Sequence, residues 1–77
     1  MLTTEKPGKP VVSPSAVRRI RLDREMTQQE LANLADLSLG QISRIEGGKI
    51  DSPHFRTVRK LAGALGVETE DLYSRKH

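Results

Sequence analysis

Residues 27–46 decide the fold, and they read TQQELANLADLSLGQISRIE. Two capping boxes occur in this stretch, formed by Thr27 with Glu30 and by Ser38 with Gln41. In each box the hydroxyl accepts a hydrogen bond from a free backbone N–H at a helix start, and the side chain three residues later reaches back to the cap. The letters DLS that lead into the second box are typical of a tight turn. The stretch therefore predicts two short helices separated by a turn.

The two predicted helices expose different surfaces. The first, which ends near residue 35, places apolar residues on slightly more than one face, namely Leu31, Ala32, Leu34 and Ala35. In the second, which ends at Gly47–Gly48, Ile42 and Ile45 point inward. Its outward face consists of Leu39, Gly40, Ser43 and Arg44. Small alanines let the helices approach closely, as in a helix-turn-helix, whose second helix is presented to a DNA major groove.

The segment before this pair divides into an arm and a helix. Residues 1–12 contain two prolines and one glycine and show no periodicity. We expect them to form a disordered N-terminal arm, which leaves residues 13–77 as the domain. Ser13 caps the first helix, Pro14 takes the one position at which a helix tolerates proline, and the helix runs to about Arg24.

The segment after the pair predicts two more helices. Ser52–Pro53 repeats the cap-and-proline start, and an apolar stripe follows it, made of Phe55, Val58, Leu61, Ala62 and Leu65. Gly66 ends this fourth helix, and Val67 and Leu72 can staple a short fifth helix across Glu68. The sequence thus predicts an all-α, compact five-helix domain with the helix-turn-helix at its second and third helices.

Composition excludes several classes of protein. A chain of 77 residues is one small domain, without room for a buried dinucleotide. It has no cysteine, and His54 and His77 lack metal-ligand spacing, so we expect no disulfide, metal or cofactor. Thirteen Lys and Arg against ten Asp and Glu give a net charge of +3, a sign that suits nucleic acid. The lack of a membrane-length apolar run or a signal peptide favours a cytoplasmic protein.

Residues 17–73 resemble the Cro/repressor type of helix-turn-helix protein, also called the XRE family. The matching text is VRRIRLDREMTQQELANLADLSLGQISRIEGGK at residues 17–49 and PHFRTVRKLAGALGVETEDL at residues 53–72. The resemblance implies a lambda-repressor-like domain that binds operator DNA as a symmetric dimer, with no enzyme activity and no cofactor. Two positions depart from the family, since glycine is usual at both. Asp36 stands in the turn, where the backbone must be left-handed, and Glu25 stands at the end of the first helix.

The resemblance also implies a set of DNA-binding residues. Residues expected beside the sugar–phosphate backbone are Gln28, Ser38, Ser43 and Lys49, and those expected to read bases are Leu39, Gly40, Gln41 and Arg44. His54 matches a position near the minor groove in similar phage repressors, the alternative being a solvated histidine at a helix start. Leu39 has an alternative, since it can pack on a thymine methyl or support Leu37 at the edge of the core. The family often carries a glutamine at Leu39 that pairs with the one at Gln28, a bond that leucine cannot make. Arg21 and Glu46 match a pair that bridges the first and third helices in similar phage repressors.

We therefore expect a bacterial or phage transcriptional regulator, with repression favoured, that binds a palindromic duplex site as a homodimer. The dimer forms in solution or only on DNA, through Leu72, Tyr73 and the ends of the last two helices. We expect no small-molecule ligand. The alternatives are a restriction–modification controller protein and an antitoxin that binds a toxin as well as DNA. An RNA-binding module is disfavoured because the chain has only two aromatic residues, and an enzyme is the weakest alternative.

Overall fold

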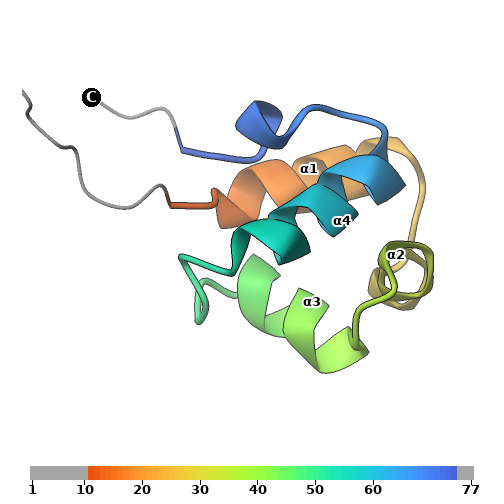
Figure 1. Cartoon of the computed structure of the whole chain (residues 1–77). Helices are drawn as coiled ribbons and strands as arrows, with labels where there is room; N and C mark the ends of the chain where they lie inside the picture. The colour runs from red at the N-terminus through yellow and green to blue at the C-terminus, as the bar shows by residue number, and fades with distance from the viewer. Residues whose placement is uncertain (1–10, 75–77) are drawn as a thin grey trace, which may run out of the picture.

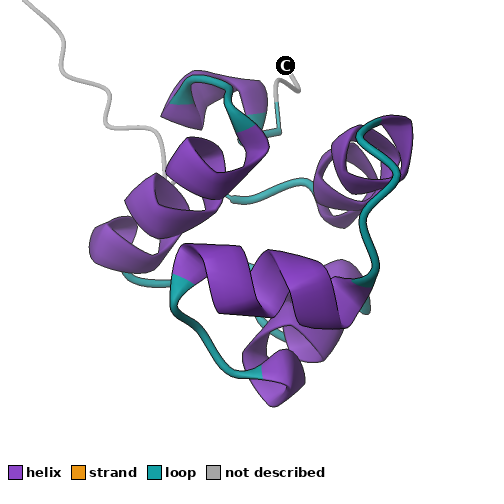
Figure 2. Cartoon of the chain, turned by 90° about the vertical axis from the view of Figure 1, so that its right-hand side faces the viewer, coloured by secondary structure: helices purple, strands orange, loops and turns teal. Residues whose placement is uncertain are grey.

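The computed structural model describes residues 11–74, which form helices and loops and contain no strand (Figure 2). The elements are α1 (Pro14–Asp23), α2 (Gln28–Ala35), α3 (Leu39–Glu46), α4 (Phe55–Leu65) and a 3-10 turn, η1 (Thr69–Asp71). The prediction of an all-α fold is confirmed. The prediction of five α-helices is wrong, because the last element has only three residues. Asp71 Oδ2 accepts a hydrogen bond from the Glu68 N–H at 3.0 Å, which closes a single tight turn.

The helix-turn-helix lies where the capping boxes predicted it. Thr27 Oγ1 accepts the Glu30 N–H at 3.0 Å, and Ser38 Oγ accepts the Gln41 N–H at 3.1 Å. Between the two helices Asp36 has φ 59° and ψ 46°, the left-handed conformation that turns the chain from α2 into α3. In Figure 1, α3 runs along the lower part of the domain and α2 stands beside it; α2 packs on both α3 and α4, and α1 packs on α3.

A single core joins the four helices. Its buried apolar residues are Val12, Val17, Ile20, Leu31, Ala32, Ala35, Ile42, Ile45, Val58, Leu61, Ala62, Leu65 and Leu72. Two residues expected in it are instead exposed, Leu34 at 63% and Phe55 at 55%. The apolar residues of α2 cover more than the one face that packs against the core, and Leu34 lies outside that face. Phe55 is the first residue of α4 and precedes the buried residues of that helix.

The start of α4 differs from the prediction. Ser52–Pro53 does not cap this helix, because His54 keeps an extended backbone with ψ 144° and the helix begins only at Phe55. His54 is the N-cap, and its Nδ1 accepts the Arg56 N–H at 3.2 Å. At the other end Gly66 has φ 72°, so the predicted C-terminal stop is confirmed.

The two ends of the described chain meet. The Ser13 N–H donates to the Leu72 carbonyl at 2.8 Å, the Ser74 N–H donates to the Val11 carbonyl at 2.7 Å, and Val12 forms a β-bridge with Tyr73. Residues 1–10 of the expected arm lie outside the described residues. Val12 is only 1% exposed, so the packed domain reaches one residue further than the expected boundary at residue 13.

This closure overturns one part of the dimer hypothesis. Leu72 has no exposed surface, since it packs in the core beneath the bridge between the chain ends. It therefore cannot contribute an apolar surface to a second copy of the chain.

Candidate nucleic-acid interface

The outward side of α3 is an open surface. Leu39 is 43% exposed, and Gly40, Ser43 and Arg44 are exposed along the same helix, whereas Ile42 and Ile45 are fully buried on the opposite side. This division follows from the helical period, since residues three apart share a face. Among the described residues Arg44 has no ion-pair partner. The α3 surface (Leu39, Gly40, Ser43 and Arg44) thus offers one cation, one hydroxyl, one apolar side chain and one position without a side chain.

Arg21 and Glu46 fix the end of α3 to α1. Glu46 Oε2 accepts a hydrogen bond from Arg21 Nε at 2.6 Å, and Glu46 Oε1 accepts one from Arg21 Nη2 at 2.9 Å. Arg21 Nη1 also donates to the Met26 carbonyl at 2.7 Å. Both charged side chains are largely buried, with exposures of 8% and 3%. The predicted bridge is confirmed, and its hydrogen bonds to Glu46 raise the pKa of Arg21 despite the opposing effect of burial.

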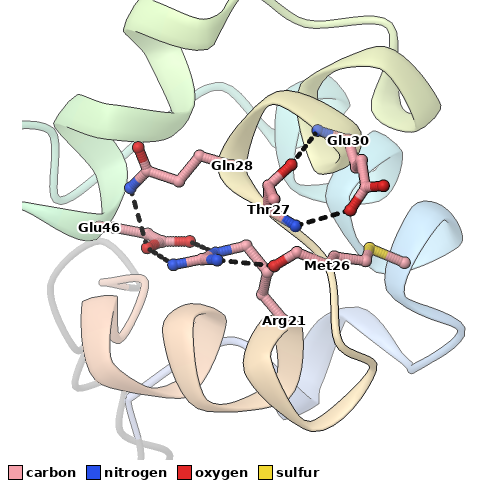
Figure 3. Close-up of polar contacts among 6 residues, drawn as sticks. All are labelled: Arg21, Met26, Thr27, Gln28, Glu30 and Glu46. Atoms are coloured by element: carbon pink, nitrogen blue, oxygen red, sulfur yellow. Dashed lines mark hydrogen bonds and ion pairs between the residues drawn. The ribbon is translucent and has the colours of Figure 1, made fainter.

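Gln28 joins this pair from α2. Figure 3 shows the side chains of Arg21, Gln28 and Glu46 converging from three helices, with Gln28 Nε2 3.1 Å from Glu46 Oε1. Gln28 is half-buried and is the first residue of α2. We name these three residues the α1–α2–α3 network. A phosphate contact is expected at the start of α2, and the α1–α2–α3 network holds that helix start against the end of α3.

Ser38 and Gln41 are engaged with one another at the start of α3. Ser38 Oγ accepts the Gln41 N–H, and Gln41 Oε1 accepts the Ser38 N–H at 3.2 Å. These bonds use the hydroxyl lone pair of Ser38 and the amide oxygen of Gln41. The Ser38 hydroxyl also donates to Gln41 Oε1 at 3.4 Å, so the donor that this pair retains for another molecule is the Gln41 NH₂ group.

Lys49 and His54 lie outside α3, in the segment that joins it to α4. Lys49 is exposed, and its backbone N–H donates to the Arg44 carbonyl at 2.8 Å, just after Gly48 turns the chain at φ 78°. His54 is exposed with its Nδ1 used as the cap of α4. Within the described part of the chain no hydrogen bond or ion pair joins these two side chains to α3, so the α3 surface and these two residues are separate elements of the candidate interface.

Sequence reasoning missed the contact between Gln28 and Glu46. A signal for it existed, because leucine at position 39 removes the usual glutamine partner and leaves the Gln28 amide to find another acceptor. It also missed Arg24, whose Nε donates to the Leu65 carbonyl at 2.7 Å and so ties the end of α1 to the end of α4. Among the described residues no group of His, Asp or Glu could hold a metal ion, and no helix is long and apolar enough to cross a membrane.

A family model described as helix-turn-helix matches residues 17–72, which include the whole of α2, α3 and α4. The chain belongs to the XRE-type helix-turn-helix family. The two features by which it departs from that family are accommodated, since Glu25 and Asp36 both adopt positive φ, at 56° and 59°.

Two curated relatives match over most of this chain. The HTH-type transcriptional repressor RghR of Bacillus subtilis is 41% identical over 56 residues, which are 73% of this chain and 42% of RghR. The putative antitoxin HigA2 of Mycobacterium tuberculosis is 37% identical over 54 residues, which are 70% of this chain and 54% of HigA2. The chain therefore spans about half the length of these relatives.

Solved structures share the same helix-turn-helix fold. The restriction–modification controller protein C.AhdI from Aeromonas hydrophila superposes with a TM-score of 0.72 at 26% identity, over 75% of this chain and 86% of C.AhdI. The controller protein C.Esp1396I bound to a 25 base pair operator site superposes with a TM-score of 0.66 at 27% identity, over 71% of each chain.

Proposed function

We propose that this chain binds specific duplex DNA sites as a transcriptional regulator, with α3 in the major groove. The observation that carries the proposal is the α3 surface, whose polar and small residues face outward from a helix fixed at its end to α1 and α2. A major groove admits a helix of this kind, and a helix that is held rigidly can discriminate between base edges.

The two classes of contact fall to different residues in this proposal. Arg44 donates to a guanine edge, Leu39 packs on a thymine methyl, and Gly40 lets the helix backbone approach the groove. Gln28 and Lys49 contact phosphates, aided by the free N–H groups at the start of α2, and His54 lies near the minor groove. The Gln41 amide donates from the first turn of α3, and the Ser38 hydroxyl donates to DNA in exchange for its 3.4 Å bond to Gln41 Oε1.

Repression and operator binding are supported by the relatives. RghR is described as a transcriptional repressor, and C.Esp1396I has been solved on an operator. Two copies of this chain on a palindrome place their α3 helices in successive major grooves, about 34 Å apart. Because Leu72 is buried, the dimer contact uses other surface, and the free protein is monomeric if that contact is small.

Selection of bound sequences from a random duplex library tests the proposal. A palindromic consensus is expected, and sedimentation on that duplex is expected to give two protomers per site. Recovery of no enriched sequence would refute sequence-specific binding. One protomer per full site at saturation would leave DNA binding intact and refute the dimer.

A second candidate is an antitoxin, favoured by the similarity to HigA2. An antitoxin of this fold binds a partner toxin as well as DNA, so the DNA-selection experiment does not separate the two functions. Co-expression of this chain with the neighbouring reading frames separates the two functions. A second protein that purifies with this chain and is toxic when expressed alone would establish the antitoxin role.

A further inference from the structure

The orientation of the Gln28 amide is decided by Glu46. A carboxylate can only accept hydrogen bonds, so the NH₂ group of Gln28, and not its oxygen, must face Glu46 Oε1 across the 3.1 Å contact. Figure 3 shows this arrangement, with the amide oxygen turned away from the carboxylate. Within residues 11–74, Glu46 is the only hydrogen-bond partner that the structure gives the Gln28 side chain.

Glu46 is itself fixed before Gln28 reaches it. Both of its carboxylate oxygens accept from Arg21, and Arg21 is anchored a third time by the Met26 carbonyl. With only 3% of its side chain exposed, Glu46 has no freedom to follow a mobile partner. The half-buried amide of Gln28 therefore adjusts to Glu46, and one hydrogen of its Nε2 remains available to another acceptor.

We infer that Glu46 is a positioning residue for DNA binding: it holds the Gln28 amide so that the second N–H donates to a phosphate. The inference rests on the proposed function. Without a fixed partner the Gln28 amide would rotate freely and sample orientations that turn its oxygen toward the anion, whereas only the nitrogen can donate. Glu46 removes that ambiguity, and it replaces an orienting partner that the apolar side chain of Leu39 cannot supply.

The test is a mutant cycle on affinity for the selected duplex. One background is the native chain, in which Arg21 holds Glu46, and the other is Arg21→Met/Glu46→Met, which removes both charges together and leaves neither buried without its partner. The two backgrounds thus differ in the presence of an acceptor-only carboxylate beside Gln28. Gln28→Ala is then introduced into each background. Thermal unfolding and the salt dependence of binding are measured for all four chains.

The loss of DNA affinity caused by Gln28→Ala is expected to depend on the side chain at position 46. Gln28→Ala should weaken binding about tenfold in the native background, as expected for a lost hydrogen bond to a charged group, and less than twofold in the Arg21→Met/Glu46→Met background. The salt slope should stay the same, because a neutral amide displaces no counterion. Equal losses in the two backgrounds would overturn the inference. A parent chain that binds no duplex would instead refute the proposed function.

Discussion

The carboxylate of Glu46 accepts two hydrogen bonds from Arg21, at 2.6 Å from Nε and 2.9 Å from Nη2, and so locks the last residue of α3 to α1. Two parallel N–H···O bonds fix direction as well as distance. The raised pKa of Arg21 means that the guanidinium stays protonated as the pH rises, so deprotonation of Arg21 does not release the pair at alkaline pH. The orientation of the α3 surface depends on this pair.

Removing one member of the pair should cost much more than removing an exposed ion pair. Glu46→Ala leaves a guanidinium that is only 8% exposed without its counter-charge, and the free energy of unfolding should fall by about 3 kcal/mol. The double variant Arg21→Met/Glu46→Met should recover most of that loss. Lys60→Ala, which breaks the exposed pair with Asp36, is the control and should cost about 0–1 kcal/mol. In denaturant unfolding, a double variant that loses as much unfolding free energy as Glu46→Ala would show that Arg21 and Glu46 do not interact.

Lys49 should contribute to affinity without contributing to sequence preference. Its exposed ammonium can neutralise one phosphate, so Lys49→Ala should weaken binding to all duplexes alike and flatten the slope of log K against log salt by about 0.9. Arg19→Ala is the control, because Arg19 is exposed on the side of α1 away from its buried residues. A slope that changes equally in both variants would mean that Lys49 contributes only net charge.

Arg44 should read a base. Arg44→Ala is expected to cost about 1–3 kcal/mol on the selected duplex, to cost much less on random DNA, and to relax one position in each half-site, expected to be a guanine. Leu39→Ala should relax a neighbouring thymine more weakly, since only an apolar contact is lost. Binding measured on both duplexes decides the matter. Equal losses on both would assign Arg44 to a phosphate and leave reading to Leu39, Gly40 and Gln41, together with DNA shape.

Gly40 should lower the stability of α3 and, because it has no side chain, allow α3 to approach DNA closely. An added Cβ would meet only Ser38 Oγ at 3.9 Å, so Gly40→Ala should raise the free energy of unfolding by about 1 kcal/mol. On the α3 surface the same methyl should weaken binding to the selected duplex. Gly63→Ala is the matched control in α4, where a Cβ meets nothing within 4 Å, and it should stabilise the protein without affecting binding. Unchanged DNA affinity in Gly40→Ala would indicate that position 40 does not approach the groove.

Val12 should behave as a core residue and its neighbour as a surface residue. Val12→Ala removes two buried methyl groups and should cost about 1–2 kcal/mol in unfolding free energy, because Val12 is 1% exposed. Val11→Ala, at a side chain that is 40% exposed, should change it by less than about 0.5 kcal/mol. If the two variants unfolded at the same denaturant concentration, the domain would begin after Val12.

The sequence by itself determined the features that depend on neighbouring residues. The capping boxes of Thr27 and Ser38 set the starts of α2 and α3, Gly66 set the end of α4, and the helical period placed Ile42 inside and Arg44 outside. Each signal acts through hydrogen bonds or side-chain directions within about four residues. Such interactions form whenever the local helix forms, so they can be predicted from the sequence without knowing which elements pack against that helix.

Only the tertiary structure decided which distant groups meet. The pairing of chain ends that buries Val12 and Leu72 joins residues far apart in sequence, and the exposure of Phe55 depends on where the packing on α4 stops. The contact from Gln28 to Glu46 requires the start of α2 and the end of α3 to lie together, which α1 arranges through Arg21. Burial and long-range hydrogen bonding depend on how whole helices pack, and no periodicity within one helix encodes them.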